Sequence, residues 1–240
     1  MYGKQIELPV LGSSETYAVR PSKIIALGLN YRDHIAESLS VKVRGMGTDE
    51  PAEPVLFPKL PSALTGPGEP IVIPSIIDTY DFEEPRTDYE GELAVIIGEA
   101  CRSVEVSKAL SYVFGYTCMN DVSQRNIQNG DRSGWFRGKS FDTFAPIGPA
   151  VLRSSDLPDP QDLDITCRLN GETRQSSNTR HMIFPVAETI SFVSRNFSLY
   201  PGDIILTGTP SGVGPLAPGD TVEVEVSMIG TLRNPVVSER

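Results

Sequence analysis

The sequence predicts an α+β fold that is mainly β and closes into a mixed roll or sandwich. Short β-rich runs recur along the 240 residues, helical patterns are few, and 21 Gly and 20 Pro mark many turns. The hydrophobic share of 39% is that of a globular chain, and the length allows one large domain. We therefore expect a short N-terminal arm over residues 1–20 and a single domain over 21–240.

Runs of β-forming residues mark the candidate strands. The last of them alternates, with valines at 222, 224 and 226 on one face and polar side chains on the other, which predicts a half-exposed strand. The expected ranges are 23–29, 70–74, 92–98, 112–120, 163–170, 203–210 and 220–230.

Fewer segments have helical patterns. We expect helices over 31–38, with Asn30 as N-cap, directly after Asp121, and over 185–196. The segment 38–54 has no clear period and carries Gly, Pro and acidic residues, so it is either a lid over a site or a disordered connector. We favour the lid.

Charge and composition exclude several classes of function. The net charge of −10 argues against binding nucleic acid, and an anionic substrate would need a local positive centre. No apolar stretch is long enough to span a membrane, and the N-terminus lacks a signal-peptide pattern. The scattered Cys101, Cys118 and Cys167 are typical of reduced thiols, so we expect a cytoplasmic protein.

The run DYEGELAVII, residues 88–97, carries paired carboxylates beside an apolar strand. Glu90 and Glu92 share one strand face, ~7 Å apart, and Asp88 lies on the same face. Carboxylates held together near a dry core need a proton, a cation or a metal ion, and oxygen ligands favour Mg²⁺, Mn²⁺ or Ca²⁺. The same pattern also fits an exposed strand end with solvated acids.

Asp121 ends another apolar strand and permits two interpretations. Asp121 and Gln124 form a capping-box pattern, which makes Asp121 a candidate N-cap as well as a candidate ligand. Arg125 and Gln128 fall on roughly the same face of the following helix. An arginine and an amide there suit a small carboxylic acid, although both could equally be exposed.

His34, Glu37 and Lys139 are further candidates. A carboxylate three residues after a histidine can orient it as a general base, or the two can form an exposed pair. Lys139 follows Gly138 among aromatic residues, so partial burial would require a partner, whereas most lysines are solvated. The run 207–214 (TGTPSGVG) lacks the ending of a phosphate loop and predicts a tight turn.

Taken together and in order, these segments resemble the fumarylacetoacetate hydrolase superfamily, in particular its single-domain branch. The motifs that carry the resemblance are ALGLNYRDH, PVLFPKLPSALTGPGEPIVIP, DYEGELAVIIG, GYTCMNDVSQRNIQ, GKSFDTFAPIGP, LNGETRQSSNTRHMIF and LYPGDIILTGTPSGVGPLAPGD.

The resemblance implies a mixed β-roll, usually homodimeric, with a metal at its mouth. Glu90, Glu92 and Asp121 match the metal ligands, for which we expect Mg²⁺, with Mn²⁺ or Ca²⁺ as alternatives. His34 and Glu37 match the dyad of the acylpyruvase and oxaloacetate decarboxylase members. The remaining matches are Lys139 as the active-site lysine, Arg125, Gln128 and Thr209 as substrate-binding residues, and Thr143 near the metal.

The expected activity is metal-dependent cleavage of a carbon–carbon bond in a small 2-oxo acid. The substrate would be an acylpyruvate, hydrolysed by a water that His34 deprotonates, or oxaloacetate, which would lose CO₂. One alternative in the same superfamily is a 2-hydroxyhepta-2,4-diene-1,7-dioate isomerase. Another, from a different class, is a metal-binding β module without catalysis.

Overall fold

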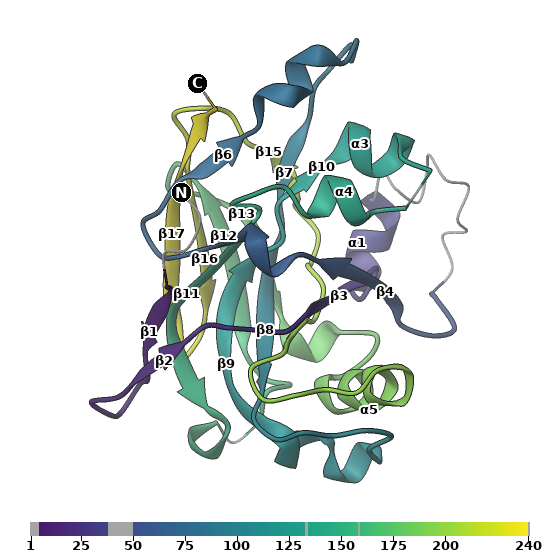
Figure 1. The fold of residues 1–240 in the computed structure, drawn as a ribbon, viewed down its shortest axis with the longest axis vertical. Coiled ribbons are helices and arrows are strands. Elements are labelled where there is room, and N and C mark those ends of the chain that lie inside the picture. The colour runs from purple at the N-terminus through teal and green to yellow at the C-terminus, as the bar shows by residue number, and fades with distance from the viewer. Residues whose placement is uncertain (1–4, 38–49, 133, 158, 240) are drawn as a thin grey trace.

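Two curled sheets packed face to face form the body of the fold, with helices along one side (Figure 1). The structure is a computed structural model that describes residues 5–37, 50–132, 134–157 and 159–239. Their arrangement confirms the predicted mainly β, α+β roll.

The larger sheet is built around β8, a strand buried along its whole length. Its odd-numbered side chains, such as Leu93 and Val95, join the core between the two sheets. Its even-numbered ones, such as Ala94 and Ile96, join a second core on the opposite face. The strands, in sheet order, are β4 (Val55–Lys59), β3 (Ile24–Gly28), β14 (Ile204–Leu206), β8 (Gly91–Ile97), β9 (Val113–Asn120), β11 (Ala145–Arg153) and β5 (Leu64–Thr65).

The second sheet packs against the face of the larger sheet that carries Leu93 and Val95. Its strand β16 buries Val222, Val224 and Val226 and leaves the residues between them half-buried, which confirms the predicted alternation. The predicted strand over 220–230 is in fact two strands, because the chain turns at Met228, where φ is 67°. The sheet order is β13 (Glu172–Asn178), β12 (Asp164–Leu169), β16 (Thr221–Val226), β17 (Gly230–Ser238) and β6 (Ile71–Ile73).

Smaller elements complete the described chain. The N-terminal arm forms a hairpin of β1 (Glu7–Pro9) and β2 (Thr16–Ala18). A short sheet joins β10 (Ser123–Gln124), β7 (Thr87–Tyr89) and β15 (Gly214–Pro215). The α-helices are α1 (Arg32–Glu37), α3 (Arg125–Gly130), α4 (Phe136–Lys139) and α5 (Val186–Asn196), and the 3₁₀ helices are η1 (Pro61–Ala63), η2 (Ser75–Thr79), η3 (Val106–Tyr112), η4 (Ser154–Asp156) and η5 (Thr179–His181).

Most of the predicted lid lies outside the described residues, because only residues 50–54 of 38–54 are described. The three cysteines are free, as predicted. None of the described helices has the length and apolar character needed to cross a membrane.

Asn30 does not cap the helix that follows it. Helix α1 begins at Arg32, and the amides of His34 and Ile35 donate to the carbonyl of Tyr31. The buried Asn30 amide instead donates to the carbonyls of Thr207 (2.7 Å) and Phe184 (3.1 Å), and its oxygen accepts from the Phe184 amide (2.8 Å). Asn30 thus ties the end of β3 to two segments distant in sequence and fixes where α1 begins.

Replacing Asn30 by Ala should destabilise the fold by about 2–4 kcal/mol, because each buried partner left unpaired costs about 1–3 kcal/mol. Urea unfolding followed by circular dichroism measures the free energy. Asn196→Ala is the matched control, since its amide donates to a single carbonyl, that of Phe192, at an exposed site (2.9 Å). A loss at Asn30 no larger than the loss at Asn196 would show that the Asn30 side chain does not hold these segments.

Candidate active site and metal centre

The ends of β8 and β9 bring three predicted ligands together. Gly91, at the start of β8, pairs with Asn120, the last residue of β9, so Glu90 and Glu92 face Asp121. Carboxylate oxygens of these three residues lie within 4.8 Å of one another, and all three side chains are buried. Their burial rules out the alternative of solvated acids at an exposed strand end.

Asp121 is not an N-cap. Gln124 caps α3 instead, where its side chain accepts from the amide of Ile127 (2.7 Å). The Asp121 carboxylate accepts from Lys59 and from Lys139, both at 2.6 Å. The capping box in the sequence is therefore a false signal at Asp121, because two buried ammonium groups occupy its oxygens.

Lys139 and Arg125 neutralise Glu90. The ammonium of Lys139 lies 2.7 Å from Glu90 and bridges it to Asp121, and Arg125 pairs with Glu90 and, at 2.8 Å, with Asp88. Burial would lower the pKa of Lys139, but the charges of Asp121 and Glu90 outweigh burial and raise it. Lys139 and Arg125 are both buried, so the alternatives of solvated side chains are wrong.

Lys59 is a buried cation that the sequence reasoning did not single out. It is the last residue of β4, and its side chain is fully enclosed. Its ammonium also donates to the backbone carbonyl of Lys139. Burial, and then the charge of Lys139, lowers the pKa of Lys59 despite the opposing attraction of Asp121. The available signal was a charged residue that ends an apolar strand, VLFPK.

Glu92 is the carboxylate that the cluster does not neutralise. One oxygen accepts from the amide of Gly208 (2.7 Å), while the buried Oε1 has no hydrogen-bond partner among the described residues. Burial, then the charges of Asp121 and Glu90, raises its pKa well above the usual range. For Glu90, burial acts in the same direction, but Lys139 and Arg125 hold its pKa well below the usual range.

These three residues fit a divalent metal ion. The unpartnered buried oxygen of Glu92 lies beside two more carboxylates, which makes an oxygen-rich position. An all-oxygen donor set suits hard ions such as Mg²⁺, Mn²⁺ or Ca²⁺.

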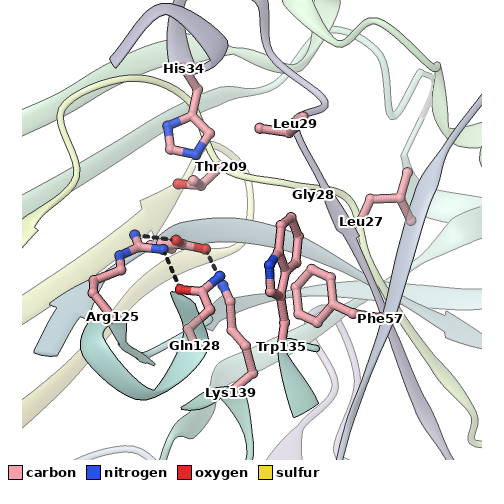
Figure 2. Close-up of a pocket in the computed structure, with 11 residues that line it drawn as sticks. Leu27, Gly28, Leu29, His34, Phe57, Arg125, Gln128, Trp135, Lys139 and Thr209 are labelled. Carbon is pink, nitrogen blue, oxygen red and sulfur yellow. Dashed lines mark hydrogen bonds and ion pairs between the residues drawn. The ribbon is translucent and has the colours of Figure 1, made fainter. Parts of the chain in front are cut away.

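A pocket lies beside the carboxylate cluster, and His34 is one of the residues that line it. Figure 2 shows the imidazole above Thr209, facing the Arg125 side of the pocket. The side chain of His34 is buried, which rules out the alternative of an exposed pair. The pocket is lined by Leu27, Gly28, Leu29, His34, Phe57, Glu90, Arg125, Gln128, Trp135, Lys139 and Thr209.

Glu37 holds His34 in place, as the three-residue spacing predicts. The imidazole Nδ1 lies 3.3 Å from a Glu37 oxygen that also accepts from the amide of Gly212 (2.7 Å). Partial burial opposes ionisation of Glu37, but the bonds from His34 and Gly212 lower its pKa. Gly212 has φ 95°, and a Cβ there would lie 2.0 Å from the carbonyl oxygen of Arg174, so only glycine fits this contact.

The remaining predicted residues divide between the pocket and its surroundings. Gln128 accepts from Arg125 (3.0 Å) and lines the pocket. Thr209, also in the lining, donates to the carbonyl of Gly91 (2.9 Å). Thr143 does not line the pocket, and its hydroxyl accepts from the amide of Val72 (2.8 Å).

Comparisons with known proteins agree with this architecture. The family model "Fumarylacetoacetate (FAA) hydrolase C-terminal" matches residues 23–237. The mitochondrial oxaloacetate tautomerase FAHD2A of Bos taurus is 43% identical over 244 residues, which cover 96% of this chain and 73% of that protein.

Solved structures are similar over nearly the whole chain. One is a fumarylpyruvate hydrolase from Pseudomonas aeruginosa in complex with Mn²⁺ and pyruvate, with a TM-score of 0.81, 32% identity, and coverage of 98% of this chain and 97% of that one. Another is a 5-carboxymethyl-2-hydroxymuconate delta-isomerase from Mycobacterium smegmatis, with a TM-score of 0.80, 38% identity, and coverage of 95% and 87%. The extent of these matches shows that the chain belongs to the fumarylacetoacetate hydrolase family.

Proposed function

We propose that the protein is a divalent-metal-dependent enzyme that cleaves a carbon–carbon bond in a small 2-oxo acid, by acylpyruvate hydrolysis or oxaloacetate decarboxylation. The observation that carries this proposal is one pocket lined both by Glu90, which belongs to the carboxylate cluster with Glu92 and Asp121, and by His34, which pairs with Glu37. Support also comes from the similar hydrolase structure that contains Mn²⁺ and pyruvate.

Glu90, Glu92 and Asp121 would hold the metal, with Mg²⁺ as the expected ion. When bound, such an ion supplies positive charge that attracts the carboxylate and 2-oxo group of the substrate and stabilises the negative charge of its enolate. This local positive charge would allow an anionic substrate to bind to a protein with a net charge of −10.

The chain's own side chains would move the protons. Since Nδ1 of His34 faces Glu37, its Nε2 is the nitrogen available to take a proton from water, and the water then attacks the distal carbonyl. Lys139 stays charged inside the protein, and with Gln128 it would stabilise the oxyanion that forms. Arg125 and Thr209 would position the substrate.

The second candidate is keto–enol tautomerisation of oxaloacetate, and the relative named for that activity, at 43% identity, favours it. Here His34 would move a proton between carbon and oxygen, and no carbon–carbon bond would break. Isomerisation of a dienedioate also needs only proton transfer, and a similar structure named as a delta-isomerase supports that alternative. A binding module without catalysis would have no need for a buried base and a buried lysine.

A substrate panel separates these reactions. Purified protein with Mg²⁺ is mixed with acylpyruvates, enol-oxaloacetate and a dienedioate, while enol absorbance and pyruvate are measured together. Cleavage should consume the enol and release one pyruvate per substrate. Loss of enol-oxaloacetate without pyruvate would instead establish tautomerisation, the same result with the dienedioate would establish isomerisation, and a protein inert toward every substrate would exclude all three reactions.

The role of Glu92 in metal binding can be tested without turnover. Mg²⁺ at a hundred times its Kd should stabilise the protein by about 2.7 kcal/mol, which raises Tm by about 5–10 °C for a chain of this size. Glu92→Gln can still accept from Gly208 but loses the charge, so it should lose this shift. Because burial disfavours ionised Glu92, the metal-free variant should melt no lower than the parent.

Differential scanning calorimetry gives both melting temperatures. Glu225→Gln, which alters a partly exposed carboxylate paired with Arg168, is the matched control and should keep the shift. A full shift in Glu92→Gln would remove Glu92 from the ligand set. A parent protein that ignores Mg²⁺, Mn²⁺ and Ca²⁺ would refute the metal proposal.

His34 should be needed for hydrolysis. His34→Ala removes the proposed base, and we expect kcat to fall about 10²–10⁴-fold. The other histidine, His181, contacts Ser177 at an exposed position (3.2 Å) and provides the control, so His181→Ala should retain parental kcat. Steady-state rates on an acylpyruvate decide the matter, and a His34→Ala enzyme as fast as His181→Ala would eliminate the water-activation step.

A further inference from the structure

The pocket has two unlike walls (Figure 2). On one side, Arg125, Gln128 and Lys139 present charged and amide groups beside Glu90. Next to it lie the side chains of Leu29, Phe57 and Trp135, which carry no charge, with the Phe57 ring centre 4.8 Å from the Lys139 ammonium. The proposed function accounts for the first wall, which would position the substrate and stabilise the oxyanion, but it assigns no role to the second.

Two aromatic rings form the centre of the apolar wall. Phe57 and Trp135 pack edge to face, with ring centroids 5.3 Å apart. Trp135 lies directly on the end of β3, since a Cβ on Gly28 would come within 2.5 Å of the indole ring. Figure 2 shows the indole nitrogen turned toward the side of Lys139 and Gln128, so the ring borders the same space as the polar wall.

Leu29 extends this wall in an unusual conformation. Its φ of 59° lies in the left-handed region, which a leucine rarely adopts. The neighbouring Asn30, held by its three buried hydrogen bonds, fixes the backbone there. Residues kept in such strained conformations concentrate at ligand-binding sites. The strained backbone places a large apolar side chain in the lining of the pocket.

The cations of the pocket are already engaged. Arg125 bonds to Asp88, Glu90 and Gln128, and Lys139 bonds to Glu90 and Asp121. Among the described lining residues, no other lysine or arginine is present to meet a second carboxylate beside the apolar wall. The cation beside this wall is the Lys139 ammonium, which is already shared by Glu90 and Asp121, so a carboxylate placed there would lose its hydration without gaining a full charge partner, which is costly.

We propose that Leu29, Phe57 and Trp135 form the subsite for the distal end of the substrate, and that this subsite takes an apolar acyl group. The inference rests on the proposed function and narrows it. The substrates are acylpyruvates with an alkyl or aryl acyl group, in preference to 2-oxo acids with a second carboxylate such as oxaloacetate. The metal and the polar wall then hold the pyruvate end and the distal carbonyl, and the apolar wall selects among acyl groups.

Trp135 is the single tryptophan of the chain, so its fluorescence reports on this wall directly. Unreactive 2-oxo acids are titrated into the protein with Mg²⁺, from pyruvate through 2-oxobutanoate and 2-oxopentanoate to 2-oxohexanoate. Each added methylene should tighten binding about fourfold, as expected for burial of a CH₂ group. The matched pair is 5-methyl-2-oxohexanoate and 2-oxoglutarate, in which an isopropyl group replaces a carboxylate. We expect the isopropyl acid to bind at least about tenfold more tightly.

Variants at Trp135 test the wall by calorimetric titration of the same pair. Trp135→Phe keeps an apolar ring and should keep the preference. Trp135→Arg places a cation in the wall and should reverse it in favour of 2-oxoglutarate. Phe136→Ala, which alters an exposed aromatic residue outside the lining, is the control and should leave the ratio unchanged. A ratio that does not respond to Trp135→Arg would overturn the assignment of this wall.

The outcomes distinguish this inference from the function on which it rests. If 2-oxoglutarate binds as tightly as the isopropyl acid, or oxaloacetate exceeds every acylpyruvate in kcat/KM, the apolar subsite is refuted while the 2-oxo acid enzyme stands. If no 2-oxo acid binds and none is converted in the presence of Mg²⁺, Mn²⁺ or Ca²⁺, the proposed function fails and the subsite fails with it.

Discussion

The rest of the site depends on the burial of three carboxylates at the junction of β8 and β9. Glu90, Glu92 and Asp121 repel one another in a region with little water, and such a cluster persists only if cations surround it. Lys139 and Lys59 meet that need for Glu90 and Asp121, and both are held by elements that the sheet places beside the cluster. Glu92 forms no ion pair among the described residues and its Oε1 has no hydrogen-bond partner there, so it is the carboxylate that the protein's own cations leave open.

Two glycines allow close packing around the carboxylate cluster. A Cβ on Gly138 would lie 2.6 Å from the amide of Gln128, so glycine allows α4 to pack against α3 and carry Lys139 into the cluster. Gly208, with φ 90°, sits against Asn30 in a similar way and turns its amide toward Glu92. The same Asn30 that stabilises the fold therefore also borders the site, which couples the position of α1, and with it His34, to the loop that binds Glu92.

Local spacing predicted the parts of the site that local geometry determines. The two-residue repeat of a strand put Glu90 and Glu92 on one face, and the three-residue step of a helix put Glu37 beside His34. Spacing along the chain does not identify contacts between residues that are distant in sequence. Asp121 matched a capping box because nothing near it in sequence shows that Lys59, 62 residues away, takes one of its oxygens. Trp135 was missed for the same reason, since its place in the pocket depends on contact with Gly28, the last residue of strand β3.

In the proposed function, one wall of the pocket would determine which reaction occurs, and the other would determine which substrate is accepted. In that function, His34 would govern where protons move, and a shared enolate would lead to cleavage, tautomerisation or isomerisation according to the atom that His34 serves. Relatives named for hydrolysis, tautomerisation and isomerisation at 32–43% identity are consistent with one scaffold that supports all three. In the proposed function, the wall of Leu29, Phe57 and Trp135 would select the acyl group, and Leu29 and Trp135 could change that choice without replacing any charged residue of the carboxylate cluster.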